Sequence, residues 1–147
     1  MRINSTDLKN LNLLKHYRII RKWACKTYNI QEADLELLIY LESLDLFTKD
    51  DFKKGTYSYS WDNRRWNRLL KQEWIKVWRK RNRTTQKYHI YKVSVKCKQL
   101  TARMYRIMIG EEDMPTKKLE SNSSYMYKVT TKAISFVNKD KTRTNVI

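Results

Sequence analysis

The sequence is poor in the residues that form tight turns, with two glycines and one proline among 147 residues. Sandwiches and barrels contain many short hairpins, and each hairpin turn needs such residues. The shortage therefore disfavours an all-β fold and favours a mainly helical one. Because 147 residues correspond to one ordinary domain, we expect a single domain.

Cysteines and long apolar runs are equally scarce. Cys25 and Cys97 provide neither a disulfide framework nor a CxxC pair, which favours a reducing compartment. No run of about 18 apolar residues occurs, and the first residues do not resemble a signal peptide. We therefore expect a cytoplasmic protein that has no membrane partner.

The sequence also lacks the motifs of catalytic and cofactor sites. It contains no Gly-rich phosphate loop, nucleophile elbow, HExxH or deaminase-type zinc signature. The two histidines, His16 and His89, have no carboxylate or cysteine at ligand spacing. We therefore expect no enzyme activity, no cofactor and no metal, and structural or surface roles for both histidines.

Acidic residues are too few to balance the basic ones. The chain has 32 Lys and Arg against 15 Asp and Glu, a net charge of +17. So much self-repulsion indicates a polyanionic partner, while a hydrophobic share of 41% argues against a disordered basic tail. Residues 64–98 hold thirteen Lys or Arg and one acid, Glu73, whereas residues 32–51 hold seven acids. The positive charge is thus concentrated in one segment.

Apolar periodicity predicts most of the helices. Repeats of three and four residues indicate helices over residues 7–28, with Ser5, Thr6 or Asp7 as the cap, and over residues 31–44. Further helices are predicted from Ser94 to a stop at Gly110, and from residue 123 or 124 to 138, before a frayed tail over residues 139–147.

A short helix is predicted after residue 48. Thr48 can cap it, and Phe47 and Phe52 have the spacing of a hydrophobic staple. Ser58 or Ser60 can cap a further helix that runs to residue 71 and is rich in arginine. We expect Trp66, on its apolar side, to lie in the core.

Period-two alternation then predicts a hairpin. Its strands cover residues 74–80 and 88–93, and its tip is basic. We expect Trp74 to lie in the core, and Trp78 to brace the hairpin or to stack on a base. A cationic helix followed by a cationic hairpin is the pattern with which a winged helix grips duplex DNA.

The order of these elements resembles the MarR-like winged helix-turn-helix family. The stretches that carry the resemblance are ADLELLIYL, WDNRRWNRLLKQEWI and YHIYKVSVKCK, and the likeness covers most of the chain. The sequence departs from the family at Glu73, where a glycine often ends the helix. It also has Arg81-Asn82-Arg83 in the wing in place of Asp-x-Arg. The sequence is therefore identified as a divergent member of this family, of phage or viral origin.

The resemblance implies a sequence-specific regulator of transcription that binds double-stranded DNA as a homodimer and is nucleoid-associated. Residues 31–93 would form the DNA-binding lobe, and the helices in 1–30 and 94–138 would form the dimer. The expected DNA-binding residues of the helix are Ser58, Ser60, Trp61, Asn63, Arg64, Arg65, Asn67, Arg68 and Lys71. Those of the wing are Lys76, Arg79, Lys80, Arg81, Asn82, Arg83 and Lys87.

Side-chain chemistry divides these residues into two groups. Arg suits guanine, Asn suits adenine and Ser suits either, so Ser60, Asn63, Arg64, Asn67 and Arg68 are the candidates for reading bases. Lys71 and the cations of the wing are expected on phosphates.

Three alternatives remain open at this stage. The chain can be a nucleic-acid packaging or assembly protein that binds without sequence choice, or a protein that binds RNA or single strands through exposed tryptophans. Cys97, in the first turn of a helix between Lys96 and Lys98, can have a lowered pKa and act as a redox switch.

Overall fold

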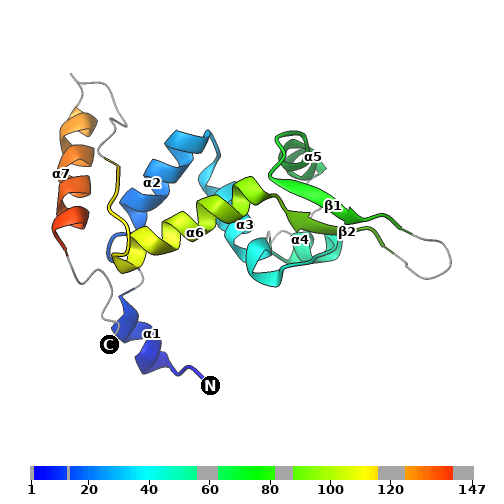
Figure 1. Ribbon diagram of the computed structural model, residues 1–147, viewed down its shortest axis with the longest axis horizontal. Coiled ribbons are helices and arrows are strands. Elements are labelled where there is room, and N and C mark those ends of the chain that lie inside the picture. The colour runs from blue at the N-terminus through cyan, green and yellow to red at the C-terminus, as the bar shows by residue number, and fades with distance from the viewer. Residues whose placement is uncertain (1, 13, 56–62, 82–87, 116–124, 141–147) are drawn as a thin grey trace. The chain divides into compact units, whose positions relative to one another are not determined.

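A computed structural model describes residues 2–12, 14–55, 63–81, 88–115 and 125–140 (Figure 1). In these ranges the chain forms seven helices and a two-stranded antiparallel sheet. The expected mainly helical class with a small hairpin is therefore confirmed. The chain divides into two units, the first made of Met1–Ile30 with Ala102–Ile147 and the second of Gln31–Thr101. The lobe expected over residues 31–93 falls inside the second unit.

The second unit begins with two helices. Helix α3 spans Glu32–Leu44, as predicted, and packs on α4, which spans Lys49–Gly55. The Thr48 N–H donates to the Asp51 carboxylate at 3.0 Å, and the Asp51 N–H donates to the Thr48 hydroxyl at 3.5 Å, which is a capping box. Phe47 and Phe52 are both fully buried on either side of this cap. The predicted cap is therefore confirmed, and both phenylalanines of the predicted staple lie in the core.

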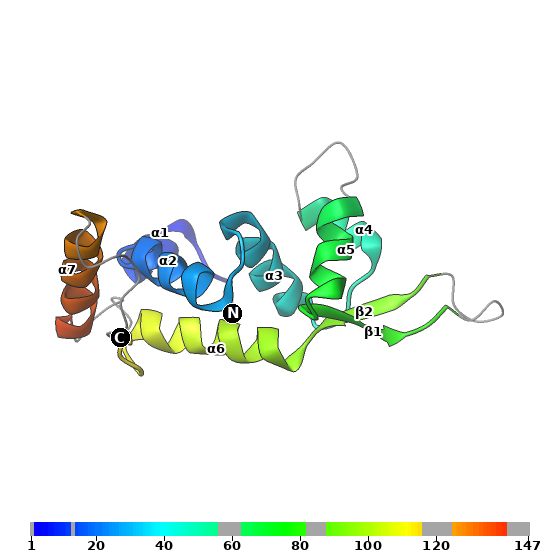
Figure 2. The ribbon, with the colours of Figure 1, turned by 90° about the horizontal axis from the view of Figure 1, so that it is seen from above.

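Helix α5 and the hairpin follow. α5 spans Asn63–Lys71, and strands β1 (Ile75–Arg79) and β2 (Ile90–Val93) pair antiparallel, with Ile75 opposite Val93 (Figure 2). Phe47 also pairs with Tyr91 of β2, through two backbone hydrogen bonds of 3.0 and 2.8 Å. The link between α3 and α4 is thereby tied to the hairpin.

Aromatic rings join α5 to its neighbours. The ring of Trp66 meets Phe52 of α4 at a centroid distance of 4.8 Å and Tyr91 of β2 at 4.7 Å, both edge-to-face. Such pairs add about 0.5–1.5 kcal/mol each beyond the area that they bury. Trp66 and Trp74 are both buried, as predicted. One side of α5 is thus fixed in the core.

A tight reversal connects α5 to β1. The Trp74 N–H donates to the Leu69 carbonyl at 2.9 Å and the Glu73 N–H donates to the Leu70 carbonyl at 3.1 Å. This is the hydrogen-bond pattern of a Schellman motif, whose C′ residue is usually glycine in the left-handed region. Glu73 occupies that position with a φ of 62°. A glutamate where the resembled family often has glycine therefore places a strained residue at this turn.

Helix α6 spans Val95–Ile109, and its termini are as predicted. The Ser94 hydroxyl accepts a hydrogen bond from the Cys97 N–H at 3.3 Å, as an N-cap does. At the other end Gly110 has a φ of 94°, and the Glu111 N–H donates to the Arg106 carbonyl at 2.9 Å. The first turns of α6 belong to the second unit and the remainder to the first.

The lowered pKa expected for Cys97 is wrong. Its thiol lies in the core, with no exposed surface. The pKa of Cys97 is raised to about 12, mainly by burial and also by the negative charge of Glu42, against the opposing effect of Lys96. Sequence position alone suggested a reactive thiolate, but the side chain faces away from solvent and stays protonated near neutral pH.

In the first unit, the single helix expected over residues 7–28 is wrong. The structure has two helices, α1 (Ser5–Leu11) and α2 (Tyr17–Tyr28). α1 ends where Asn12 takes a left-handed φ of 50°, which asparagine tolerates better than most residues. The cap is Asn4, in a reciprocal capping box with Asp7, rather than one of the three residues expected.

Helix α7 spans Tyr125–Lys139, close to the predicted range, and packs on α2. Before α2, the buried His16 places its Nε2 atom 2.8 Å from the Asp140 carboxylate, which also lies 2.8 Å from the Lys15 ammonium. The structural role expected for His16 is therefore confirmed. Within the described ranges, no helix combines the length and the apolar character needed to span a membrane.

Replacing Glu73 with glycine should raise the free energy of unfolding by about 1 kcal/mol. A left-handed residue that carries a Cβ costs roughly 1–2 kcal/mol, and the greater freedom of glycine in the unfolded chain offsets part of the gain. Urea unfolding followed by tryptophan fluorescence measures the change. Glu73→Ala is the matched control, because it removes the same charge but keeps the Cβ. Equal stabilisation by both variants would mean that the carboxylate, and not the backbone, is responsible.

Candidate nucleic-acid interface

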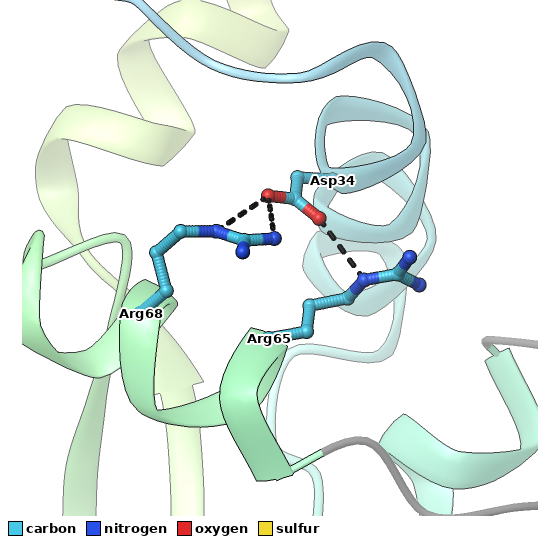
Figure 3. A network of polar contacts seen from close by, with 3 residues as sticks. All are labelled: Asp34, Arg65 and Arg68. Carbon is cyan, nitrogen blue, oxygen red and sulfur yellow. Dashed lines mark hydrogen bonds and ion pairs between the residues drawn. The ribbon is translucent and has the colours of Figure 1, made fainter.

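A buried carboxylate binds two arginines of α5 (Figure 3). Asp34 lies in α3 and is 1% exposed. The Nε and Nη2 atoms of Arg68 donate to its Oδ2 at 3.2 and 2.8 Å. The Nε of Arg65 lies 3.2 Å from its Oδ1. We call these three residues the Asp34 cluster.

The Asp34 cluster fixes the rotation of α5 about its own axis. Arg65 and Arg68 lie three residues apart, so both reach toward α3 from one side of the helix. A buried carboxylate without a cationic partner costs several kcal/mol, so any rotation that withdraws both arginines is unfavourable. With Trp66 on its buried side and the Asp34 cluster beside it, α5 is left with one defined outer face.

That outer face carries polar side chains in a slanted stripe. Asn63, Asn67 and Lys71 recur every four residues, and Arg64 lies beside them, because successive residues turn by about 100°. All four are exposed. We call them the α5 stripe. Asn and Arg are the side chains that make paired hydrogen bonds to adenine and guanine, and Lys suits phosphate.

The C-terminal end of α5 is held by Lys96 of α6. The ammonium of Lys96 donates to the Gln72 carbonyl at 2.8 Å and lies 4.0 Å from the centroid of the Trp74 ring. A cation at this end complements the helix dipole and supplies a donor to a carbonyl that the helix leaves unpaired. Ionised side chains therefore hold α5 in two places: the Asp34 cluster at its side and Lys96 at its C-terminal end.

The hairpin next to the α5 stripe is also cationic. Lys76, Arg79, Lys80 and Arg81 are all exposed. Lys76 lies directly opposite Lys92 across the two strands, although like charges in that arrangement repel each other. Neither strand contains an acidic residue. An anion such as a phosphate would relieve this repulsion.

The structure thus divides the residues predicted to bind DNA. Asn63, Arg64, Asn67 and Lys71 share the outer face of α5, whereas Arg65 and Arg68 turn toward Asp34. The hairpin exposes four of the predicted cations, Lys76, Arg79, Lys80 and Arg81. Six of the predicted residues lie outside the described ranges: Ser58, Ser60, Trp61, Asn82, Arg83 and Lys87.

Sequence reasoning missed Asp34 and Lys96. Asp34 lies in the first turn of its helix, where the helix dipole favours an acid, but it shares a face with Leu38 and Leu41, which are both fully buried. An acid on a leucine face is a signal that a cation must meet it. The sequence carries no comparable signal for Lys96, because its partners depend on how α5 and α6 meet.

Within the described ranges, no group of His, Cys, Asp and Glu residues could hold a metal ion. Comparisons of this chain with protein-family models, with curated proteins and with solved structures find no match. The resemblance to the MarR-like family therefore stays a prediction that rests on the sequence and on the arrangement of the elements.

Asp34→Asn should lower the free energy of unfolding by about 2–3 kcal/mol. Removing one partner of a fully buried ion pair costs about 3–5 kcal/mol, but the side chains of Arg65 and Arg68 keep 25% and 35% of their exposure to water. Thermal and urea unfolding measure the loss. Asp50→Asn, an exposed acid in the first turn of α4, is the control and should cost less than about 1 kcal/mol. Equal, small losses in both variants would contradict a central role for the Asp34 cluster.

Proposed function

We propose that the second unit is a winged helix of the MarR-like type that binds duplex DNA, with α5 as the recognition helix and the hairpin as the wing. The observation that carries this proposal is the α5 stripe, which has two asparagines and two cations on one exposed face, next to a hairpin with four exposed cations. The inward arginines of the Asp34 cluster support it, since they hold that face outward.

The dimensions and side chains of α5 suit the major groove. An α-helix with its side chains is about 10–12 Å wide, and the major groove of B-DNA is about 12 Å wide. Asn63, Arg64 and Asn67 would contact base edges. Lys71 and the exposed cations of the hairpin would contact phosphates, which position the protein without reading sequence.

We further propose that the protein binds as a homodimer through its terminal helices. α7 buries Ile134 and Val137 within its own unit, yet it exposes Met126, Val129 and Phe136 along an adjacent face. A second copy would cover this apolar surface. A two-fold dimer presents its recognition helices to major grooves about one helical turn apart, so the DNA site would be a pseudo-palindrome. Regulation of transcription is the function that fits such a site.

The alternative function is nucleic-acid packaging without sequence choice. The net charge of +17 favours it, because binding that depends on phosphate contacts alone gains from every cation. The two functions differ in whether the α5 stripe reads bases.

Enrichment from a randomised duplex pool at near-physiological salt should return a two-fold motif with half-sites about ten base pairs apart. Arg64→Ala should relax the preference at one position of each half-site, because a paired contact to guanine discriminates by about 1–3 kcal/mol. Arg18→Ala, which removes an exposed arginine of α2, is the matched control and should leave the motif unchanged. Tight binding without an enriched motif would contradict the proposal that α5 reads bases and would favour packaging.

Replacing both Lys80 and Arg81 with glutamine should weaken binding to all duplexes alike. The slope of log affinity against log salt should fall in magnitude by about two for each bound protomer, hence by about four for the homodimer, because each phosphate contact releases close to one counterion. Fluorescence anisotropy across a salt series measures this slope. The double variant Lys128→Gln and Lys132→Gln removes the same charge from exposed positions of α7. If both double variants lower the slope equally, the hairpin has no special contact with the backbone.

A further inference from the structure

Trp78 occupies a β-bulge in the first strand of the hairpin. Val77 lies opposite Tyr91 and Arg79 lies opposite Ile90, so Trp78 is the residue without a partner across the strands. A bulge interrupts the ladder and redirects the side chain at that position, and bulges are common beside functional sites. The hairpin therefore departs from regular pairing at the residue with its largest side chain.

The burial of Trp78 differs from that of the other described tryptophans. Trp23, Trp66 and Trp74 are each 1–2% exposed, whereas Trp78 is 45% exposed. Burying an aromatic side chain is among the largest favourable contributions to folding. An indole held half in water therefore offers a surface that a ligand can cover.

The surroundings of Trp78 are cationic. The guanidinium carbon of Arg79 lies 5.4 Å from the centroid of the Trp78 ring. Lys76 precedes the bulge and Lys80 follows it, and both are exposed. An aromatic surface beside several cations is the combination with which proteins hold single-stranded nucleic acids, because bases stack on the ring and phosphates meet the cations.

We propose that Trp78 stacks on an unpaired base of a DNA strand that emerges from the bound duplex. The proposal rests on the proposed function, because the α5 stripe and the cations of the hairpin hold the duplex. The ligand must be unpaired at that point, since the faces of bases inside a duplex are covered by their neighbours. Stacking accepts any base, so Trp78 would select the form of the DNA, a duplex with a single-stranded extension, and not its sequence.

Two DNAs that share one duplex test this inference, one blunt and one with a single-stranded thymidine extension a few nucleotides long. The extension should tighten binding of the unmodified protein by about tenfold, within the range expected for one stack. Trp78→Leu should abolish this gain, while Trp78→Phe should keep most of it because it retains an aromatic face. Tyr105→Ala, which removes a similarly exposed ring from α6, should leave the gain unchanged.

The affinity for the blunt duplex separates the two proposals. If the blunt duplex does not bind, the proposed function fails. If it binds equally well to all four proteins but the extension gives no gain, or Trp78→Leu keeps the gain, the stacking inference is wrong. The thymidine single strand is also measured alone. If it binds as tightly as the extended duplex, the stacking inference is wrong as well. Photo-crosslinking with iododeoxyuridine in the extension gives an independent readout. The peptide that contains Trp78 should carry the crosslink. A crosslink confined to other peptides counts against the inference.

Discussion

The Asp34 cluster, in which Arg65 and Arg68 bind Asp34, is the constraint on which the candidate interface depends. A carboxylate that is 1% exposed must keep a cationic partner, and its two partners among the described residues, Arg65 and Arg68, come from α5. Their three-residue spacing sets the angle at which α5 meets α3. Because the helix is rigid, fixing one side also fixes the direction of Asn63, Asn67 and Lys71 on the other. The polar stripe points to solvent as a consequence of a contact inside the unit.

The positive charge of residues 64–98 therefore has two different uses. Arg65, Arg68 and Lys96 bind a carboxylate or a carbonyl of the protein itself, and they hold α5 by its side and its C-terminal end. The exposed cations of the hairpin bind no acid of their own strands. A count of basic residues treats both groups alike, but only the second contributes fully to the field that a polyanion meets. The candidate interface is thus smaller than the count of basic residues suggests.

Local patterns in the sequence predicted the elements well, because those patterns act over a few residues. The leucines of α3, the cap at Thr48, the alternation of the hairpin and the stop at Gly110 each depend on neighbours within about one or two helical turns. The same reasoning failed at Asn12, where a single left-handed residue divides what looks like one amphipathic helix. Periodicity continues across such a break, although only α2 buries its apolar face and no residue of α1 is buried.

Properties that depend on distant partners were beyond the sequence. The apparent setting of Cys97, a helix start between two lysines, predicted a reactive thiolate, but the thiol points into the core and burial raises its pKa to about 12. The partners of Asp34 lie more than thirty residues away, as the partner of His16 lies at Asp140. Glu73 shows the converse: its position where the resembled family often has glycine was visible in the sequence, and the structure supplies the reason, a left-handed turn between α5 and β1. A residue can keep such a strained conformation only where its surroundings determine it, and here the buried Leu69 and Trp74 on either side of the turn do so.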